Sequence, residues 1–295
     1  MRRFLTVLFA TLLTLPLGAA SIAAQGATPA SGLGDYPEVA VTITEHEVQV
    51  ASDQIPAGYI RLAVTNQSAQ ENGVGLVALP EGQSLEQLAQ ATPAPDNFIP
   101  PFFYDATIAG GPTSIPPGET WSQVVHVDPG QWIVFAQNDQ QPVPVTVAET
   151  GASVTTAPTA DATITESDFT FTGFGQLQAG AQVLEVANAG EQPHMLDFFQ
   201  VPDGTTLDQV MAAISAPEDA TPAPGGLQES DITLVPGGQV IMQSSGTSAW
   251  MDVDLTPGTY VAVCFVIDPA TGMPHAMEGM VSLFEVGGAA ATPAS

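Results

Sequence analysis

The 295-residue chain has almost no basic residues. It has no lysine, and its three arginines, Arg2, Arg3 and Arg61, face 31 acidic residues, which gives a formal net charge of −28 at pH 7. Nucleic-acid and anionic-lipid recognition both need clustered cations, so we expect no nucleic-acid partner and no basic membrane-surface patch. A Walker-type phosphate loop is excluded as well, because that motif requires a lysine.

Cysteine is equally scarce. Cys264 is the only one, so no disulfide can form within the chain. The chain also lacks the Gly-x-Ser-x-Gly and His-Glu-x-x-His motifs, and we therefore do not expect an enzyme. What the chain does contain is 28 glycines, 26 prolines and 44% hydrophobic residues, a composition that favours a sizeable core built from short strands and turns.

The N-terminus reads as an export signal. Arg2 and Arg3 precede an apolar stretch over residues 4–20, and small residues follow up to Ala24. A membrane anchor is the alternative, but the stretch is short and contains Pro16. We expect a signal peptide over 1–24, a linker over 25–35, and an exported protein (periplasmic, cell-surface or secreted) with no transmembrane anchor after cleavage.

The rest of the chain contains two copies of one unit. At a constant offset of 122 positions, Leu62, Val64 and Asn66 match Leu184, Val186 and Asn188. Further on, Asp-Pro-Gly-x-Trp at 128–132 matches Thr-Pro-Gly-x-Tyr at 256–260. The ordered series predicts one domain over 36–149, a linker over 150–160, a second domain over 161–287 and a tail over 288–295.

Both units show the two-residue period of strands. In the first unit Val39, Val41 and Ile43 alternate with small or polar residues, and Phe169 and Phe171 do so in the second. Helical spacing begins at Thr206, with its counterpart over 84–88. The fold class that follows is all-β: two tandem Greek-key β-sandwiches, each with one short helix.

The second unit gathers residues that bind soft metals. His194, Cys264, His275 and Met280 fall near the ends of predicted strands. Two imidazoles and a thiolate with a weak axial thioether form the ligand set of a blue copper site. The remaining histidines, His46 and His126, have no cysteine or methionine near them, and we interpret both as strand residues without a metal role.

These stretches resemble the cupredoxin family. The Asn-containing strand end before His194, the Pro-Gly-Thr-Tyr turn before Cys264 and the Pro-His-x-x-x-Gly-Met run over 274–280 look like the sulfocyanin and rusticyanin type. The resemblance covers roughly 161–286 and implies a cupredoxin-like fold, copper as the cofactor, and metal ligands at His194, Cys264, His275 and Met280. It also implies a visible absorption band at roughly 600 nm and a near-surface His275 as the electron exit.

The loop between Cys264 and His275 is longer than the family pattern. Ten residues separate the two, whereas about two to four are typical of the family that the chain resembles. The segment contains Asp268-Pro269 and Gly272, turn residues that let it fold back and return His275 to Cys264.

The first unit provides an internal control. By the repeat, Asn72 stands at the position of His194 and Ala136 at that of Cys264, so this copy lacks the ligand set. Taken singly, each ligand candidate could be ordinary packing, since a free cysteine is usually buried. Their joint presence in one copy and joint absence in the other favours one metal site.

Three functions fit this pattern. The first is an electron carrier with one type 1 copper, whose acidic surface suits a cationic redox partner. The second is an exported copper chaperone, since His194-Met195 and His275-x-Met277 resemble the His/Met pairs of such proteins. The third is a metal-free binding or structural module, because the first unit keeps the scaffold without the ligands.

Overall fold

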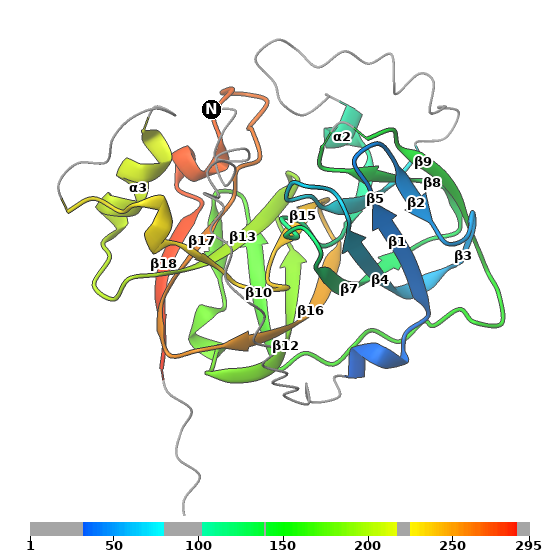
Figure 1. Ribbon diagram of the computed structural model, residues 1–295, viewed down its shortest axis with the longest axis horizontal. Helices are drawn as coiled ribbons and strands as arrows, with labels where there is room; N and C mark the ends of the chain where they lie inside the picture. Colours follow the sequence, from blue (N-terminus) through cyan, green and yellow to red (C-terminus); the bar gives the residue numbers. More distant parts are fainter. Residues whose placement is uncertain (1–31, 80–101, 139, 217–224, 288–295) are drawn as a thin grey trace, which may run out of the picture.

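Strands dominate the computed structural model, which describes residues 32–79, 102–138, 140–216 and 225–287 (Figure 1). The strands form two sheets, each of which contains strands from both units. One apolar cluster includes buried residues from both sheets, among them Leu62 and Leu76 of the first unit and Leu184 and Leu196 of the second. The all-β fold class is therefore confirmed.

The first sheet has eight strands. In spatial order these are β11 (Thr170–Thr172), β10 (Ala162–Ser167), β12 (Gly180–Asn188), β16 (Ser248–Leu255), β7 (Thr120–Val127), β4 (Gly58–Asn66), β1 (Glu38–Ile43) and β2 (Val48–Val50). The pairs β1–β4 and β10–β12 are parallel, and the other neighbours are antiparallel. The predicted alternation holds in β10, where every second residue is buried.

The second sheet contains the strand that His194 begins and the strands that Cys264 follows and Met280 precedes. Its spatial order is β18 (Val281–Val286), β17 (Gly258–Val263), β13 (His194–Val201), β15 (Val240–Gln243), β6 (Thr107–Gly110), β5 (Val74–Ala78), β8 (Gly130–Ala136), β9 (Val143–Ala148) and β3 (Gln54–Pro56), with β14 (Thr233–Leu234) paired to β13.

The helices of the described residues are short. They are η1 (Gly32–Asp35), α2 (Phe102–Asp105), η2 (Phe174–Gln176), α3 (Leu207–Ser215), η3 (Glu229–Asp231) and η4 (His275–Glu278). The helix predicted from Thr206 is confirmed as α3, with Thr206 as its N-cap in a capping box. Its predicted counterpart over 84–88 lies outside the described residues, whereas α2 was not predicted. No helix in the described ranges is long and apolar enough to cross a membrane.

The two units meet through equivalent strands. β7 pairs with β16 in the first sheet, and β6 pairs with β15 in the second, both antiparallel. Each of these strands has its counterpart in the strand it touches, so the contact has the self-complementary form of a two-fold interface. The tandem units therefore join edge to edge, so that each of the two sheets runs through both units.

Matching hydrogen bonds support the repeat. The Trp132 indole donates to the Asp128 carbonyl at 2.8 Å, and the Tyr260 hydroxyl donates to the Thr256 carbonyl at 2.7 Å. Asn66 donates to the Gln70 carbonyl just as its match Asn188 donates to Gln192. The positions that the repeat matches thus make the same contacts in both units.

Candidate metal centre

Three of the predicted ligands meet in space, and we call them the metal centre. His194 begins β13, Cys264 directly follows β17, and His275 begins η4. The Nδ1 atoms of the two histidines lie 3.1 Å apart, and Cys264 Sγ lies 3.9 Å from His194 Nδ1 and 3.5 Å from His275 Nδ1. All three side chains are fully buried. Soft sulfur and two imidazole nitrogens thus converge on one point.

The spacing of these atoms fits one small metal ion. Bonds of about 2.0–2.3 Å from an ion to nitrogen and sulfur, at angles of about 100–120°, place the ligand atoms roughly 3.1–3.9 Å from one another. The three observed separations lie in that range. Two imidazole nitrogens and one thiolate are also the donors found at type 1 copper sites. The residues present therefore fit the ion that the resemblance implies.

The long loop closes as a β-hairpin over 265–274, which we call the ligand hairpin. The His275 N–H donates to the Val266 carbonyl at 2.8 Å, and the Asp268 N–H donates to the Met273 carbonyl at 2.8 Å. At the tip the Asp268 carboxylate accepts from the Ala270 N–H and the Thr271 hydroxyl. The predicted fold-back is confirmed, and it returns His275 to Cys264 despite the ten intervening residues.

Each imidazole is held through its second nitrogen. His194 Nε2 lies 3.1 Å from Asp168 Oδ1, and His275 Nε2 lies 3.1 Å from Gln192 Oε1. Both acceptors hold the proton on Nε2 and leave the Nδ1 lone pair facing the centre. Asp168 and Gln192 were not found from the sequence, although Gln192 matches Gln70 at the repeat offset.

Asp168 is itself fixed. Its carboxylate accepts the backbone N–H groups of Glu191 and Gln192. Burial acts to raise the pKa of Asp168, but these two N–H groups and His194 outweigh it, so the pKa is lowered overall. A carboxylate that stays ionised can orient His194 and add negative charge beside a bound cation.

Burial shifts the pKa of His194, Cys264 and His275 in the direction that favours the neutral form of each. It lowers the pKa of His194, against the opposing effect of Asp168, and it lowers the pKa of His275 to about 4, with nearby His194 adding to the shift. Burial also raises the pKa of Cys264, and the charges of Glu166 and Asp197 act in the same direction, while the N–H groups of Met195 and Val266 oppose it. Cys264 is thus a thiol without metal and must release a proton when a metal binds.

Met280 lies next to these residues. It is fully buried in the same apolar cluster as Cys264. Its carbonyl accepts from the Cys264 N–H at 3.1 Å, and its N–H donates to the His275 carbonyl at 2.9 Å. The backbone thus holds the predicted axial residue between two ligands, and the thioether as a fourth, weak ligand stays a prediction.

His275 does not reach the surface, contrary to our expectation. The ring is fully buried, with Gln192 at its Nε2 and the Phe169 ring packed against it edge-to-face, the two ring centroids 5.1 Å apart and the planes at 88°. Phe169 was predicted as a strand residue, but it lies in the turn between β10 and β11 with a φ of 63°. That left-handed conformation is unfavourable for a bulky residue, and it places the ring against His275.

The described part of the first unit, residues 36–79, 102–138 and 140–149, has no such centre. Asn72 stands in place of His194, where its amide donates to Gln140 Oε1 at 3.1 Å and its oxygen accepts the Gly73 N–H at 2.9 Å. Ala136 ends β8 where Cys264 follows β17. His126 lies on β7, but His46 lies in the exposed turn between β1 and β2, so its strand prediction was wrong. An asparagine and an alanine thus stand where the second unit has the candidate ligands His194 and Cys264.

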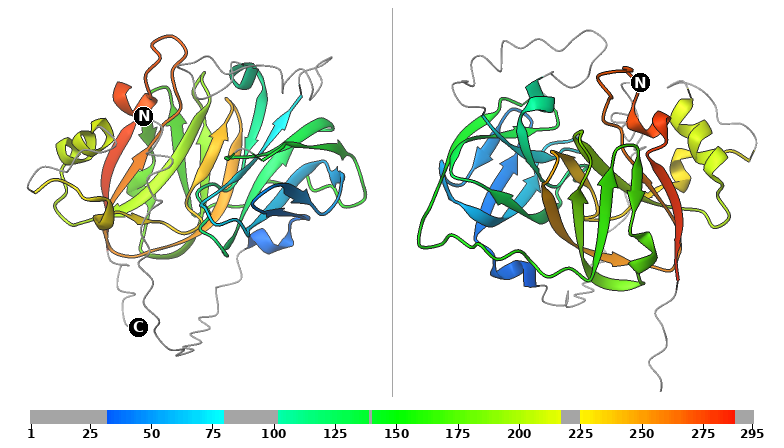
Figure 2. Two further views of the ribbon diagram at one scale, coloured as in Figure 1. Left: turned by 45° about the horizontal axis from the view of Figure 1, so that its top comes forward. Right: turned by 180° about the vertical axis from the view of Figure 1, so that it is seen from behind.

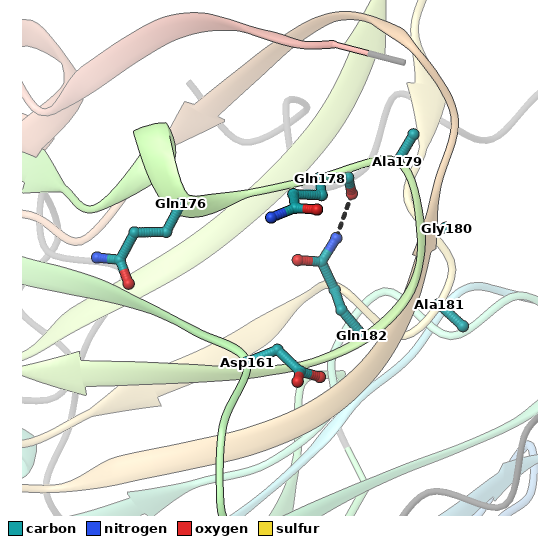
Figure 3. Close-up of a pocket in the computed structure, with 7 residues that line it drawn as sticks. All are labelled: Asp161, Gln176, Gln178, Ala179, Gly180, Ala181 and Gln182. Atoms are coloured by element: carbon teal, nitrogen blue, oxygen red, sulfur yellow. Dashed lines mark hydrogen bonds between the residues drawn. The ribbon is translucent and has the colours of Figure 1, made fainter. Parts of the chain in front are cut away.

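A polar hollow lies at the far end of β12 from the metal centre (Figure 3). Asp161 and Gln176 line it together with residues 178–182. The hollow lies at the Gly180 end of β12, whereas Asn188, at the other end, bonds to Gln192 beside the metal centre. The nine residues of this strand span roughly 25 Å, so the hollow is separate from the metal centre.

The chain thus combines a fold of two mixed β-sheets with a buried histidine–cysteine–histidine cluster whose ligand atoms are placed to hold one metal ion. No family model and no curated protein matches the chain. Among solved structures, dithionite-reduced auracyanin from the photosynthetic bacterium Roseiflexus castenholzii is 17% identical, with a TM-score of 0.27 over 38% of this chain and 96% of that chain.

Two further structures are similar at the same level. Auracyanin B is 16% identical, with a TM-score of 0.26 over 42% of this chain and 86% of that chain. A multicopper oxidase is 14% identical, with a TM-score of 0.23 over 84% of this chain and 88% of that chain. The metal centre therefore stands on its own side-chain geometry.

Proposed function

We propose that this chain is an exported copper-binding electron carrier with one type 1 copper, which His194, Cys264, His275 and Met280 would hold. The observation that carries the proposal is the convergence of Cys264 Sγ and two imidazole Nδ1 atoms within 3.9 Å of one another in a fully buried position. A copper ion bound there supplies one-electron chemistry, because it is stable in two oxidation states.

The protein supplies a rigid setting for that chemistry. His194 is the first residue of a strand, Cys264 extends the next one, and His275 follows a hydrogen-bonded hairpin. The second nitrogen of each ring is held by Asp168 or Gln192. Ligands fixed in this way move little when the charge at the centre changes, and a low reorganisation cost favours fast electron transfer.

Export and an acidic surface complete the proposal. Cleavage after residue 24 leaves Arg61 as the only basic residue besides the histidines, against 31 acidic residues. A surface of one sign speeds encounters with a partner of opposite charge and slows encounters with its own kind. We therefore propose a cationic redox partner outside the cytoplasm.

The proposal is tested by the visible spectrum and copper content of the mature protein after Cu(II) loading and removal of excess metal. We expect one copper per chain and an intense visible band that disappears in Cys264→Ala. Copper retained only in the reduced, colourless state indicates a chaperone instead. No retained copper in either state leaves a metal-free module and refutes both metal functions.

A further inference from the structure

The ligand hairpin of the second unit touches the first unit. The Tyr104 hydroxyl, on α2 of the first unit, donates to the Ile267 carbonyl at 2.6 Å. The two residues are 163 positions apart in the sequence, and Tyr104 is half-buried against the main apolar cluster. Both views of Figure 2 show α2 (teal) and the ligand hairpin (orange) at the same end of the two sheets. The ligand-free unit thus makes a direct contact with the loop that brings His275 to the centre.

The contact falls at a sensitive point of the hairpin. Ile267 forms an antiparallel bridge with Pro274, the residue directly before His275. On either side of this bridge lie the hydrogen bonds between His275 and Val266 and between Asp268 and Met273. A displacement of Ile267 is therefore passed to His275 through one bridged residue, and to Cys264 through two residues of chain.

The chain around Tyr104, on the first-unit side of the contact, is held by hydrogen bonds of its own. The Ser244 hydroxyl, directly after β15, donates to the Ala106 carbonyl at 2.8 Å and accepts the Ile108 N–H at 2.9 Å. Ala106 lies two residues after Tyr104, and Gln243, directly before Ser244, is paired with His194. The chain around α2 thus bonds both to the strand beside His194 and to the hairpin that ends at His275.

The tyrosine is a hydrogen-bond donor at every pH of interest. Burial raises the pKa of Tyr104 to about 12, and the nearby Asp268 carboxylate adds to the shift. The hydroxyl therefore keeps its proton, and a short bond to a carbonyl oxygen is the interaction that such a group makes best.

We propose that the first unit acts as a brace for the metal centre and that Tyr104 is the positioning residue through which it holds the ligand hairpin closed. The role of Tyr104 in copper binding rests on the proposed function, whereas its role in keeping the ligand hairpin closed does not. The brace accounts for two features together: a first unit without ligands, and a ten-residue ligand loop that nonetheless returns His275 to Cys264.

The test compares Tyr104→Phe with Tyr36→Phe in the full mature chain. Tyr36 is a matched control, because its hydroxyl also donates to a backbone carbonyl, that of Thr156, at 3.1 Å, and neither residue belongs to the metal centre or the ligand hairpin. The first readout is amide hydrogen exchange of metal-free protein at Asp268, Gly272 and His275. We expect about fivefold faster exchange in Tyr104→Phe, the factor that corresponds to the usual net contribution of one hydrogen bond, and no change in Tyr36→Phe.

The second readout uses copper-loaded protein. In Tyr104→Phe we expect about fivefold faster copper release to a chelator and a shifted electron paramagnetic resonance spectrum, since His275 is held less firmly. Unchanged hairpin exchange in Tyr104→Phe, or equal acceleration in both variants, overturns the brace. Wild-type protein that binds no copper refutes the proposed function, and the exchange experiment then still decides whether the brace exists.

Discussion

Asp168 offers the sharpest test of how the metal centre is held. Its carboxylate binds His194 Nε2 at 3.1 Å and is fixed by the N–H groups of Glu191 and Gln192. Loss of such a partner of a ligand histidine typically lowers metal affinity about 10- to 100-fold, or roughly 1.4–2.7 kcal/mol. We expect that loss of Cu(II) affinity in Asp168→Ala, measured by competition with a chelator of known affinity. Asp168→Asn removes the charge but keeps an acceptor, so its loss is smaller.

The same two variants predict a change in reduction potential. A negative charge beside the metal stabilises Cu(II) more than Cu(I), so its removal raises the potential in both variants. The control is Asp161→Ala, which also removes a carboxylate bonded to a backbone N–H, that of Val183 at 2.8 Å, but roughly 20 Å further along β10. Affinity within twofold of wild type in Asp168→Ala, or an equal loss in Asp161→Ala, refutes this role of Asp168.

Three further predictions concern residues around the centre. Burial raises the pKa of Glu166 from its ordinary 4.5 to about 8, against the opposing effect of Gln243, so the folded protein favours the protonated carboxyl. As the pH rises from about 5 to 8, the wild-type protein should therefore lose about 1.4 kcal/mol of stability per pH unit relative to Glu166→Gln, measured by urea unfolding at each pH. Identical pH profiles contradict the shift. Phe169→Asn puts a residue that tolerates a φ of 63° at this position and removes the ring that packs against His275. Copper release to a chelator should quicken, while the urea midpoint of unfolding stays nearly constant. An unchanged release rate speaks against shielding of the metal centre by the Phe169 ring. Because burial lowers the pKa of His275 to about 4, the metal-free protein binds fewer protons than the unfolded chain between about pH 4 and 6.5, and His275→Gln should lessen the loss of stability on acidification through that range; an equal loss in both proteins contradicts it.

The sequence singled out the candidate ligands because few residue types bind copper, and cysteine and histidine are rare here. Cys264 is the only cysteine, and the repeat shows Ala136 and Asn72 at the equivalent positions of the copy without ligands. The strands were predictable for a similar reason, since the alternation in residues 39–43 has one physical interpretation. Chemistry and periodicity of this kind are local properties of a sequence.

The rest depends on contacts that local patterns do not contain. Asp168 and Gln192 are common polar residues, and only the fold places them against His194 and His275. Phe169 follows the alternation of a strand, yet the turn conformation prevails at its position. The pairing of β7 with β16 was also not predictable, because the sequence of an edge strand does not show that it will pair with a strand of another unit.

The most direct test of the account is X-ray absorption spectroscopy of the copper-loaded mature protein. The account predicts two nitrogen neighbours at about 2.0 Å and one sulfur neighbour at about 2.3 Å, the usual lengths of metal–imidazole and metal–thiolate bonds. The sulfur neighbour should be absent from Cys264→Ala loaded in the same way. Copper surrounded only by nitrogen and oxygen in the wild-type protein would contradict a centre built on His194, Cys264 and His275.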